Sequence, residues 1–211
     1  MEAQPLLGLK RMWLRQRKLL ASIALLSILI FVVLQYWQHH KTVRSEEASH
    51  IYSTLLEEGM NKHNLQILEA QGKTLLNDFR DTPYAQLAAL LMAKGSMEKQ
   101  DWDQALQHLR FAATQFPKGL VTAVARLRLA KVLGSRSQYD EALEHLKNPP
   151  TGYEGLYEEI KGDVYRAEKQ FAQALNAYQA SLTYLKDTST SPILQMKVNE
   201  MIILSQSPKG A

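Results

Sequence analysis

The sequence predicts an all-α protein with one N-terminal transmembrane helix, a solenoid of about four helix pairs and a C-terminal capping helix. Two observations lead to this prediction: an uncharged apolar segment near the N-terminus, and a repeated pattern of aromatic and small residues after it. No stretch of strand length alternates between apolar and polar residues. The predicted parts are a basic tail over residues 1–18, the span with its interface over 19–40, the repeat domain over 41–205 and a C-terminal tail over 206–211.

The uncharged segment from Leu19 to His40 is long enough to cross a membrane. Its apolar part ends at Trp37, and at about 1.5 Å per residue it forms a helix of about 28 Å, close to the thickness of the hydrocarbon core. The segment is longer than the apolar region of a cleaved signal peptide, and it ends in polar and aromatic residues rather than small ones. We therefore expect an uncleaved anchor, with Tyr36 and Trp37 at the far interface.

Small residues recur along one side of the span. Ala21, Ala24 and Ser27 lie three positions apart, and small side chains let a second membrane helix approach closely. The same spacing also occurs by chance in helices that face only lipid. A helix–helix contact and a plain lipid-facing surface are therefore both open interpretations.

The distribution of charge predicts the orientation of the span. Residues 1–18 carry five cations and one acid, whereas residues 41–211 carry 20 basic and 20 acidic side chains. By the positive-inside rule the N-terminus stays in the cytoplasm, so the C-terminal domain of a bacterial inner-membrane protein lies in the periplasm. The domain has no net positive charge, which argues against nucleic-acid binding. The absence of cysteine excludes disulfides, thiolate metal sites and cysteine nucleophiles.

Three segments of the domain repeat an aromatic residue followed three positions later by alanine. The first of them fits the 34-residue tetratricopeptide (TPR) pattern. In this pattern the aromatic residue closes the turn between two antiparallel helices, and the alanine lies where a larger side chain would hold the helices apart. Each first helix has its own small residue twelve positions before that alanine. The aromatic residues are Trp102, Tyr139 and Phe171, their alanines are Ala105, Ala142 and Ala174, and the first-helix small residues are Ala93, Ala130 and Gly162.

One further helix pair precedes these repeats without their signature. Segments 45–59 and 65–79 place apolar residues at helical intervals, as in a degenerate terminal repeat. Pro83 and Pro192 each follow a capping residue and predict the first turn of a helix. The last of these helices is expected to end at about Ser205.

In this register the first helices of the repeats line the concave face of the solenoid. Their mixture of leucine, methionine and lysine suits unfolded or amphipathic segments. Some of the apolar members are expected to belong to the core between helices, and the cations Lys94, Lys131 and Arg166 either contact a partner or remain solvated. The predicted face consists of Leu87, Leu90, Lys94, Met97, Val124, Leu127, Lys131, Leu156, Glu159, Asp163 and Arg166.

The sequence contains no motif of a catalytic, metal or cofactor site. HExxH, GxSxG and glycine-rich phosphate loops do not occur, so we predict a protein that is not an enzyme and needs no cofactor. His39 and His40 are expected to be polar residues that flank the span. His108 and His145 hold equivalent positions in successive repeats, which predicts exposed side chains rather than converging ligands.

Two further segments complete a resemblance to a known family that covers nearly the whole chain. Residues 125–132, Ala-Arg-Leu-Arg-Leu-Ala-Lys-Val, open a repeat, and residues 194–199, Leu-Gln-Met-Lys-Val-Asn, lie in the last helix. With the early single span after a short basic tail, they resemble the YfgM-type ancillary subunits of the SecYEG translocon, bitopic inner-membrane proteins with a periplasmic TPR-like domain. The resemblance implies association with SecYEG through the membrane helix, and partners among exported client proteins and periplasmic chaperones.

We therefore predict a non-enzymatic, membrane-anchored TPR interaction module that assists the periplasmic handling of exported proteins as an ancillary SecYEG subunit. The alternative is a TPR scaffold for another envelope assembly process, such as outer-membrane insertion or cytochrome maturation. Whether the protein forms homo-oligomers is left open.

Overall fold

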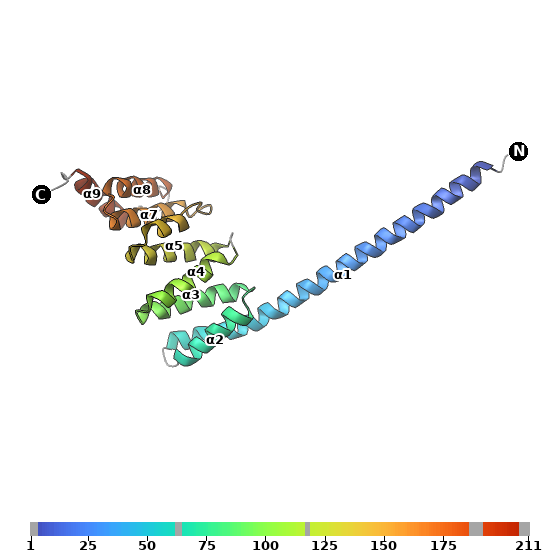
Figure 1. Ribbon diagram of the computed structural model, residues 1–211, viewed down its shortest axis with the longest axis horizontal. Helices are drawn as coiled ribbons and strands as arrows, with labels where there is room; N and C mark the ends of the chain where they lie inside the picture. Colours follow the sequence, from blue (N-terminus) through green and yellow to red (C-terminus); the bar gives the residue numbers. More distant parts are fainter. Residues whose placement is uncertain (1–3, 62–64, 117–118, 186–191, 207–211) are drawn as a thin grey trace. The chain divides into compact units, whose positions relative to one another are not determined.

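The computed structural model describes residues 4–61, 65–116, 119–185 and 192–206, and within these ranges the chain is helical apart from short turns. The all-α prediction is therefore confirmed. The side chains of the predicted basic tail, and residues 207–211 of the predicted C-terminal tail, lie outside the described part of the chain. The chain divides into two compact units, Met1–Glu47 and Ala48–Ala211. The helices are α1 (Gln4–Asn61), α2 (Leu65–Asp78), α3 (Pro83–Glu98), α4 (Trp102–Thr114), α5 (Leu120–Ser135), α6 (Tyr139–His145), α7 (Glu154–Ala167), α8 (Phe171–Tyr184) and α9 (Pro192–Gln206) (Figure 1).

Helix α1 is longer than the sequence predicts. A separate helix is expected over residues 45–59, but α1 runs without a break from Gln4 to Asn61. No glycine or proline occurs between Gly8 and Gly59, so nothing in the backbone ends the helix earlier. The predicted span and the first helix of the first pair are therefore parts of one helix.

Helices α3 to α8 form three predicted antiparallel pairs, and Figure 1 shows the helices from α2 to α9 stacked one after another. The three repeats with the aromatic signature are α3 with α4, α5 with α6, and α7 with α8. The predicted aromatic residue is the first residue of α4, α6 and α8. The last helix, α9, begins at the predicted proline and ends within one residue of the predicted end.

The turns inside the three repeats share one backbone conformation. Gln100, Ser137 and Lys169, each two residues before the aromatic, have positive φ angles of 61°, 60° and 64°. In each turn the next amide donates to a carbonyl five residues earlier, at 2.8–2.9 Å. This bond is the one that ends a helix in a Schellman motif. It releases the chain from the first helix so that the aromatic residue can begin the second.

The small residues of the pattern lie at the helix crossings, as predicted. Ala93 and Ala130 in the first helices, and Ala105, Ala142 and Ala174 in the second helices, are all fully buried. Their methyl groups let paired helices approach closely, because a longer side chain at the same place would overlap the facing helix.

Gly162 takes the small position of α7 because an aromatic ring fills the space beside it. A Cβ atom on Gly162 would lie 2.4 Å from Cε1 of Tyr178, whose side chain is fully buried. The Tyr178 hydroxyl donates to Oδ1 of Asp163 at 2.8 Å. Burial, followed by this hydrogen bond, raises the pKa of Tyr178, so the phenol remains neutral.

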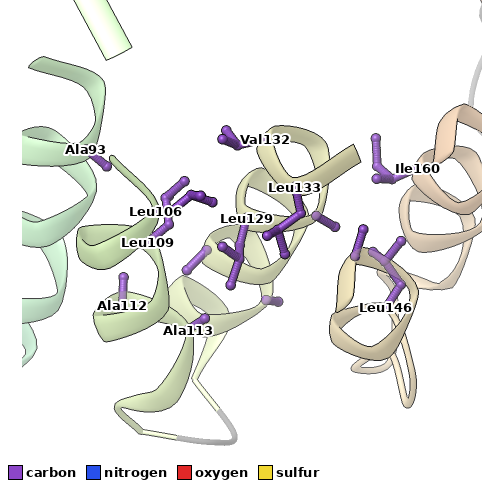
Figure 2. Packing of buried hydrophobic residues seen from close by; sticks show 14 of the residues in the cluster. Ala93, Leu106, Leu109, Ala112, Ala113, Leu129, Val132, Leu133, Leu146 and Ile160 are labelled. Atoms are coloured by element: carbon purple, nitrogen blue, oxygen red, sulfur yellow. The ribbon is translucent and has the colours of Figure 1, made fainter. Parts of the chain in front are cut away.

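A continuous hydrophobic core connects α3 to α7. Figure 2 shows Leu129 and Leu133 of α5 between the side chains of α4 on one side and Leu146 and Ile160 on the other. Burial of each leucine stabilises the fold by about 1.5–3 kcal/mol relative to an exposed side chain. A second cluster joins the C-terminal part of α1 to α2 and α3, and a third joins α8 to α9.

Helix α6 is the shortest of the described helices, with seven residues. The chain leaves it through Asn148, which has a positive φ of 54°, and then through Pro149 and Pro150, which cannot extend a helix. Helix α5 also contacts α7 directly. Gly134 of α5 belongs to this contact, because a Cβ atom there would lie 3.3 Å from Cγ2 of Val164.

Buried hydrogen bonds join one repeat to the next. Nε2 of Gln86 donates to the carbonyl of Ala112 and to Oγ1 of Thr122, both at 2.7 Å. The Thr122 hydroxyl in turn donates to the carbonyl of Phe116 at 2.9 Å. Because Gln86 is only 2 % exposed, these partners replace the water that its amide would otherwise bind.

Candidate functional site

The candidate site is the face of the first helices that the sequence predicts to be concave. We call its eleven predicted residues on α3, α5 and α7 the first-helix face. On α3, Leu87 and Met97 are half-buried and Lys94 is exposed, with its Nζ 3.8 Å from Oε1 of Glu98. Leu90 is buried in the core, so it is one of the apolar members that belong to the packing between helices. The α3 part of the face is therefore mainly a covered apolar surface with one loosely paired cation.

The α5 part of the face is more cationic. Val124 and Leu127 are half-buried, and Leu127 packs against the core. Lys131 is exposed, and no ion pair involves it in the described part of the chain. Helix α5 contains two arginines in addition to Lys131 and no acidic residue, so no side chain of its own helix can neutralise this lysine.

The α7 part of the face carries the charged groups of both signs. Leu156 is 42 % exposed, Glu159 and Asp163 are half-buried, and Arg166 is exposed. These residues follow one another at intervals of three and four, which places them on one side of the helix.

Helix α9 binds to this part of the face through ion pairs that the sequence does not predict. Nζ of Lys197 lies 2.8 Å from Oε1 of Glu159 and 2.7 Å from Oδ1 of Asp163. Burial alone would lower the pKa of Lys197, but its hydrogen bonds to Asp163 and Glu159 outweigh burial and raise that pKa. Arg166 makes a longer contact of 3.4 Å with Glu200, and both of these side chains are nearly half exposed.

The contacts of α9 reveal a register that continues the first-helix face. Residues 194, 198 and 201 of α9 are buried against α8, whereas its opposite side is exposed. The face residues of α5 follow those of α3 by 37 positions in the sequence. The same step of 37 positions, counted from the α7 members of the face, leads to four exposed residues of α9. A sequence comparison at this step would have found them. They are Ile193, Met196, Glu200 and Ile203.

A cavity of about 310 Å³ lies between α5, α7 and α9. Lys131, Arg166 and Lys197 line it, together with Asp163 and an apolar wall that includes Ile160 and Val164. The cavity thus combines three cations from three helices with apolar surface, and it can hold an anionic group that is attached to an apolar one.

The two repeat histidines do not form a metal site. His108 lies in a cavity of about 150 Å³ next to α2 and α3, and His145 lies in another of about 400 Å³ next to α4 and α5. Both are half-buried, so the prediction that they are exposed is wrong. Burial lowers the pKa of each. Among the described residues, no group of three or more histidine, cysteine or acidic side chains gathers in a way that could hold a metal.

The N-terminal unit contains the candidate span. In the described part of the chain one helical stretch, Ala21–Glu57, is long and apolar enough to cross a membrane, and its most apolar window has a mean hydropathy of 1.8. The predicted contact residues Ala21, Ala24 and Ser27 are exposed. The Ser27 hydroxyl donates to the carbonyl of Ala24 at 2.8 Å, so this polar group is satisfied within its own helix.

Comparison with known proteins covers nearly the whole chain. The sequence matches the tetratricopeptide repeat-like domain family over residues 10–202. It is 28 % identical over 202 residues to the ancillary SecYEG translocon subunit of Neisseria gonorrhoeae, with 95 % of this chain and 97 % of that protein aligned. It is 30 % identical over 187 residues to the ancillary SecYEG translocon subunit of Haemophilus influenzae, with 82 % of this chain and 88 % of that protein aligned.

Proposed function

Since the chain belongs to the family of ancillary SecYEG translocon subunits, we propose that it is a single-pass inner-membrane protein whose repeats form an interaction module beside the SecYEG channel. The family match includes both the apolar helix and the helical repeats, because it extends from residue 10 to residue 202. This relationship over nearly the full length is the observation that carries the proposal.

The repeat domain works on the periplasmic side of the membrane in this proposal. The net charge of +4 in residues 1–18, against a balanced domain, supports a cytoplasmic N-terminus. The span anchors the protein at the channel, with the small residues Ala21, Ala24 and Ser27 as the surface that another membrane helix approaches.

The module acts by binding and not by catalysis. Its relatives are named as subunits of a translocon, and their names describe no chemical reaction. Exported polypeptides and the chaperones that receive them are the partners of the first-helix face. Tethering makes weak binding sufficient, because a site held near the channel exit experiences an effective concentration of client that approaches about a millimolar.

Copurification from detergent-solubilised membranes tests the proposal. We expect the full-length chain to copurify with SecYEG. A variant that lacks residues 1–40 should no longer copurify with the channel. A matched variant replaces residues 19–40 with an unrelated single span and keeps the tail, so that it remains in the membrane. If the span is the docking element, this variant also loses the channel. Failure of the full-length chain to copurify would refute the proposal, and retention of the channel by the truncated chain would refute docking through the span.

A further inference from the structure

We propose that the C-terminal end of the first-helix face, formed by α5, α7 and α9, binds an unfolded polypeptide segment in which a carboxylate lies next to apolar side chains. Lys131 and Arg166 bind the carboxylate, and Ile193, Met196 and Ile203 of α9 contact the apolar residues. The inference rests on the proposed function, because it names the class of client that the interaction module takes.

Two of the three cations that line the cavity remain able to bind a ligand. Lys197 already has two carboxylate partners at 2.7 and 2.8 Å, so it is neutralised within the protein. The contact between Arg166 and Glu200 is longer, at 3.4 Å, and water reaches both groups. Lys131 enters the same cavity from α5, and no ion pair in the described part of the chain includes it. A carboxylate placed between Lys131 and Arg166 therefore gains two cationic partners and competes only with the loosely held Glu200.

Hydrogen bonds pair three of the carbonyl groups that end α5 near Lys131. Carbonyl groups at a helix C-terminus carry partial negative charge when they are unpaired. In α5 the carbonyls of Val132, Leu133 and Gly134 accept hydrogen bonds from amides of residues 136–138 at 2.9–3.1 Å. These hydrogen bonds reduce the negative partial charge at this end of α5, and the ammonium group of Lys131 supplies a full positive charge beside it.

The cavity favours a carboxylate over a phosphate. Glu159, Asp163 and Glu200 surround Arg166 and Lys197, and the one negative charge that this set leaves over is balanced by Lys131. The cavity thus has no excess of positive charge that would favour a dianion, and a single carboxylate binds by replacing Glu200 beside Arg166. A group with one negative charge can be accommodated, whereas a phosphate dianion would meet three nearby carboxylates. Ile160 and Val164 form an apolar wall beside the cations, which suits the carbon atoms of a peptide side chain.

The exposed side of α9 supplies the apolar part of the surface. Ile193, Met196 and Ile203 are 65 %, 70 % and 71 % exposed, and their spacing places them on one side of the helix. Leu156 of α7, at 42 % exposure, precedes Ile193 by the 37-residue step and belongs to the same register. Glu200 lies between Met196 and Ile203 on this side and contacts Arg166, so the apolar residues adjoin the cationic cavity. Flexible methionine and branched isoleucine side chains can meet many different apolar residues, as unfolded clients require.

Fluorescence anisotropy with labelled peptides tests the inference on the full-length chain in lipid nanodiscs. The probe is a 15-residue peptide that carries glutamate within a leucine- and phenylalanine-rich segment. One matched peptide has glutamine in place of glutamate, and another has serine in place of the apolar residues. We expect the glutamate peptide to bind more tightly than either, with a preference over the glutamine peptide of about two- to five-fold for each cation. This preference should shrink as salt is added.

Three variants separate the two parts of the surface. Lys131→Gln and Arg166→Gln should each reduce the preference for the glutamate peptide and leave binding of the glutamine peptide unchanged. Met196→Ser should weaken both peptides by the same factor. Lys73→Gln, a change of an exposed lysine on α2 outside the cavity, is the control that should alter neither. Equal affinity of wild type for the glutamate and glutamine peptides would overturn the inference, as would a preference in Lys131→Gln that is as large as in wild type.

The same samples keep this inference distinct from the proposed function. Copurification with SecYEG depends on the span in our proposal, so all these variants should retain the channel. If the wild type fails to bind the peptide but still copurifies with the channel, only the inference is wrong. If the wild type fails to copurify, the proposed function itself is wrong.

Discussion

Replacement of Gly162 by alanine tests the packing of α7 against α8 most directly. The new Cβ atom would lie 2.4 Å from Cε1 and 2.5 Å from Cδ1 of Tyr178, so the ring must move by about 1 Å to reach an ordinary contact distance. The ring cannot move freely, because it is fully buried and its hydroxyl donates to Asp163 at 2.8 Å. Overpacking costs about 1–3 kcal/mol, and a weakened hydrogen bond to a carboxylate about 1.5–3 kcal/mol. The higher helix propensity of alanine offsets about 1 kcal/mol of this destabilisation.

We therefore expect Gly162→Ala to lower the free energy of unfolding by about 2–4 kcal/mol. Urea denaturation of the full-length chain in detergent, followed by circular dichroism, measures the change. With a slope of about 2 kcal/mol per molar urea, the midpoint should fall by about 1–2 M. Gly95→Ala is the matched control, because its Cβ would meet only Cδ2 of Leu68 at 3.9 Å. That variant should be as stable as wild type or slightly more stable, and equal stability of the two variants would refute the packing argument.

Two other predictions concern buried polar groups. Gln86→Ala removes the donor to Ala112 and should destabilise the fold by about 2–3 kcal/mol in the same assay, whereas the exposed Gln104→Ala should change it by less than about 0.5 kcal/mol. Burial lowers the pKa of His108 and His145 in the folded protein. As the pH falls below the ordinary histidine pKa of 6.5, the unfolded chain therefore binds more protons than the folded protein, and the free energy of unfolding decreases. Glutamine at both positions should flatten the loss of stability between about pH 7 and pH 5, and an unchanged slope would contradict this assignment.

The helix pairs could be predicted because their packing depends on side-chain size. The aromatic residue at the start of each second helix and the buried alanine after it leave a pattern that can be read without a structure. The turns between them could not be predicted in the same way. Their left-handed residues are Gln100, Ser137 and Lys169, although glycine is the usual signal for that conformation.

The candidate site was predicted less completely than the fold. Periodicity places Lys131 and Arg166 correctly on the exposed side of their helices, but it cannot separate them from Leu90, which the core buries. The same periodicity predicts α9 only as a capping helix. Its ion pairs with α7 emerge only from contacts between distant parts of the chain, since Lys197 reaches Glu159 across 38 residues.

Because α6 has only seven residues, it makes a short layer near the middle of the stack of repeats. In an array held together by neighbour-to-neighbour contacts, each interface between units contributes its own part to the stability of the whole. At this layer α5 and α7 contact each other directly, and Lys131 of α5 and Arg166 of α7 line the same cavity. A polypeptide bound by both side chains would bridge the two helices, so binding would stabilise the folded module at this interface.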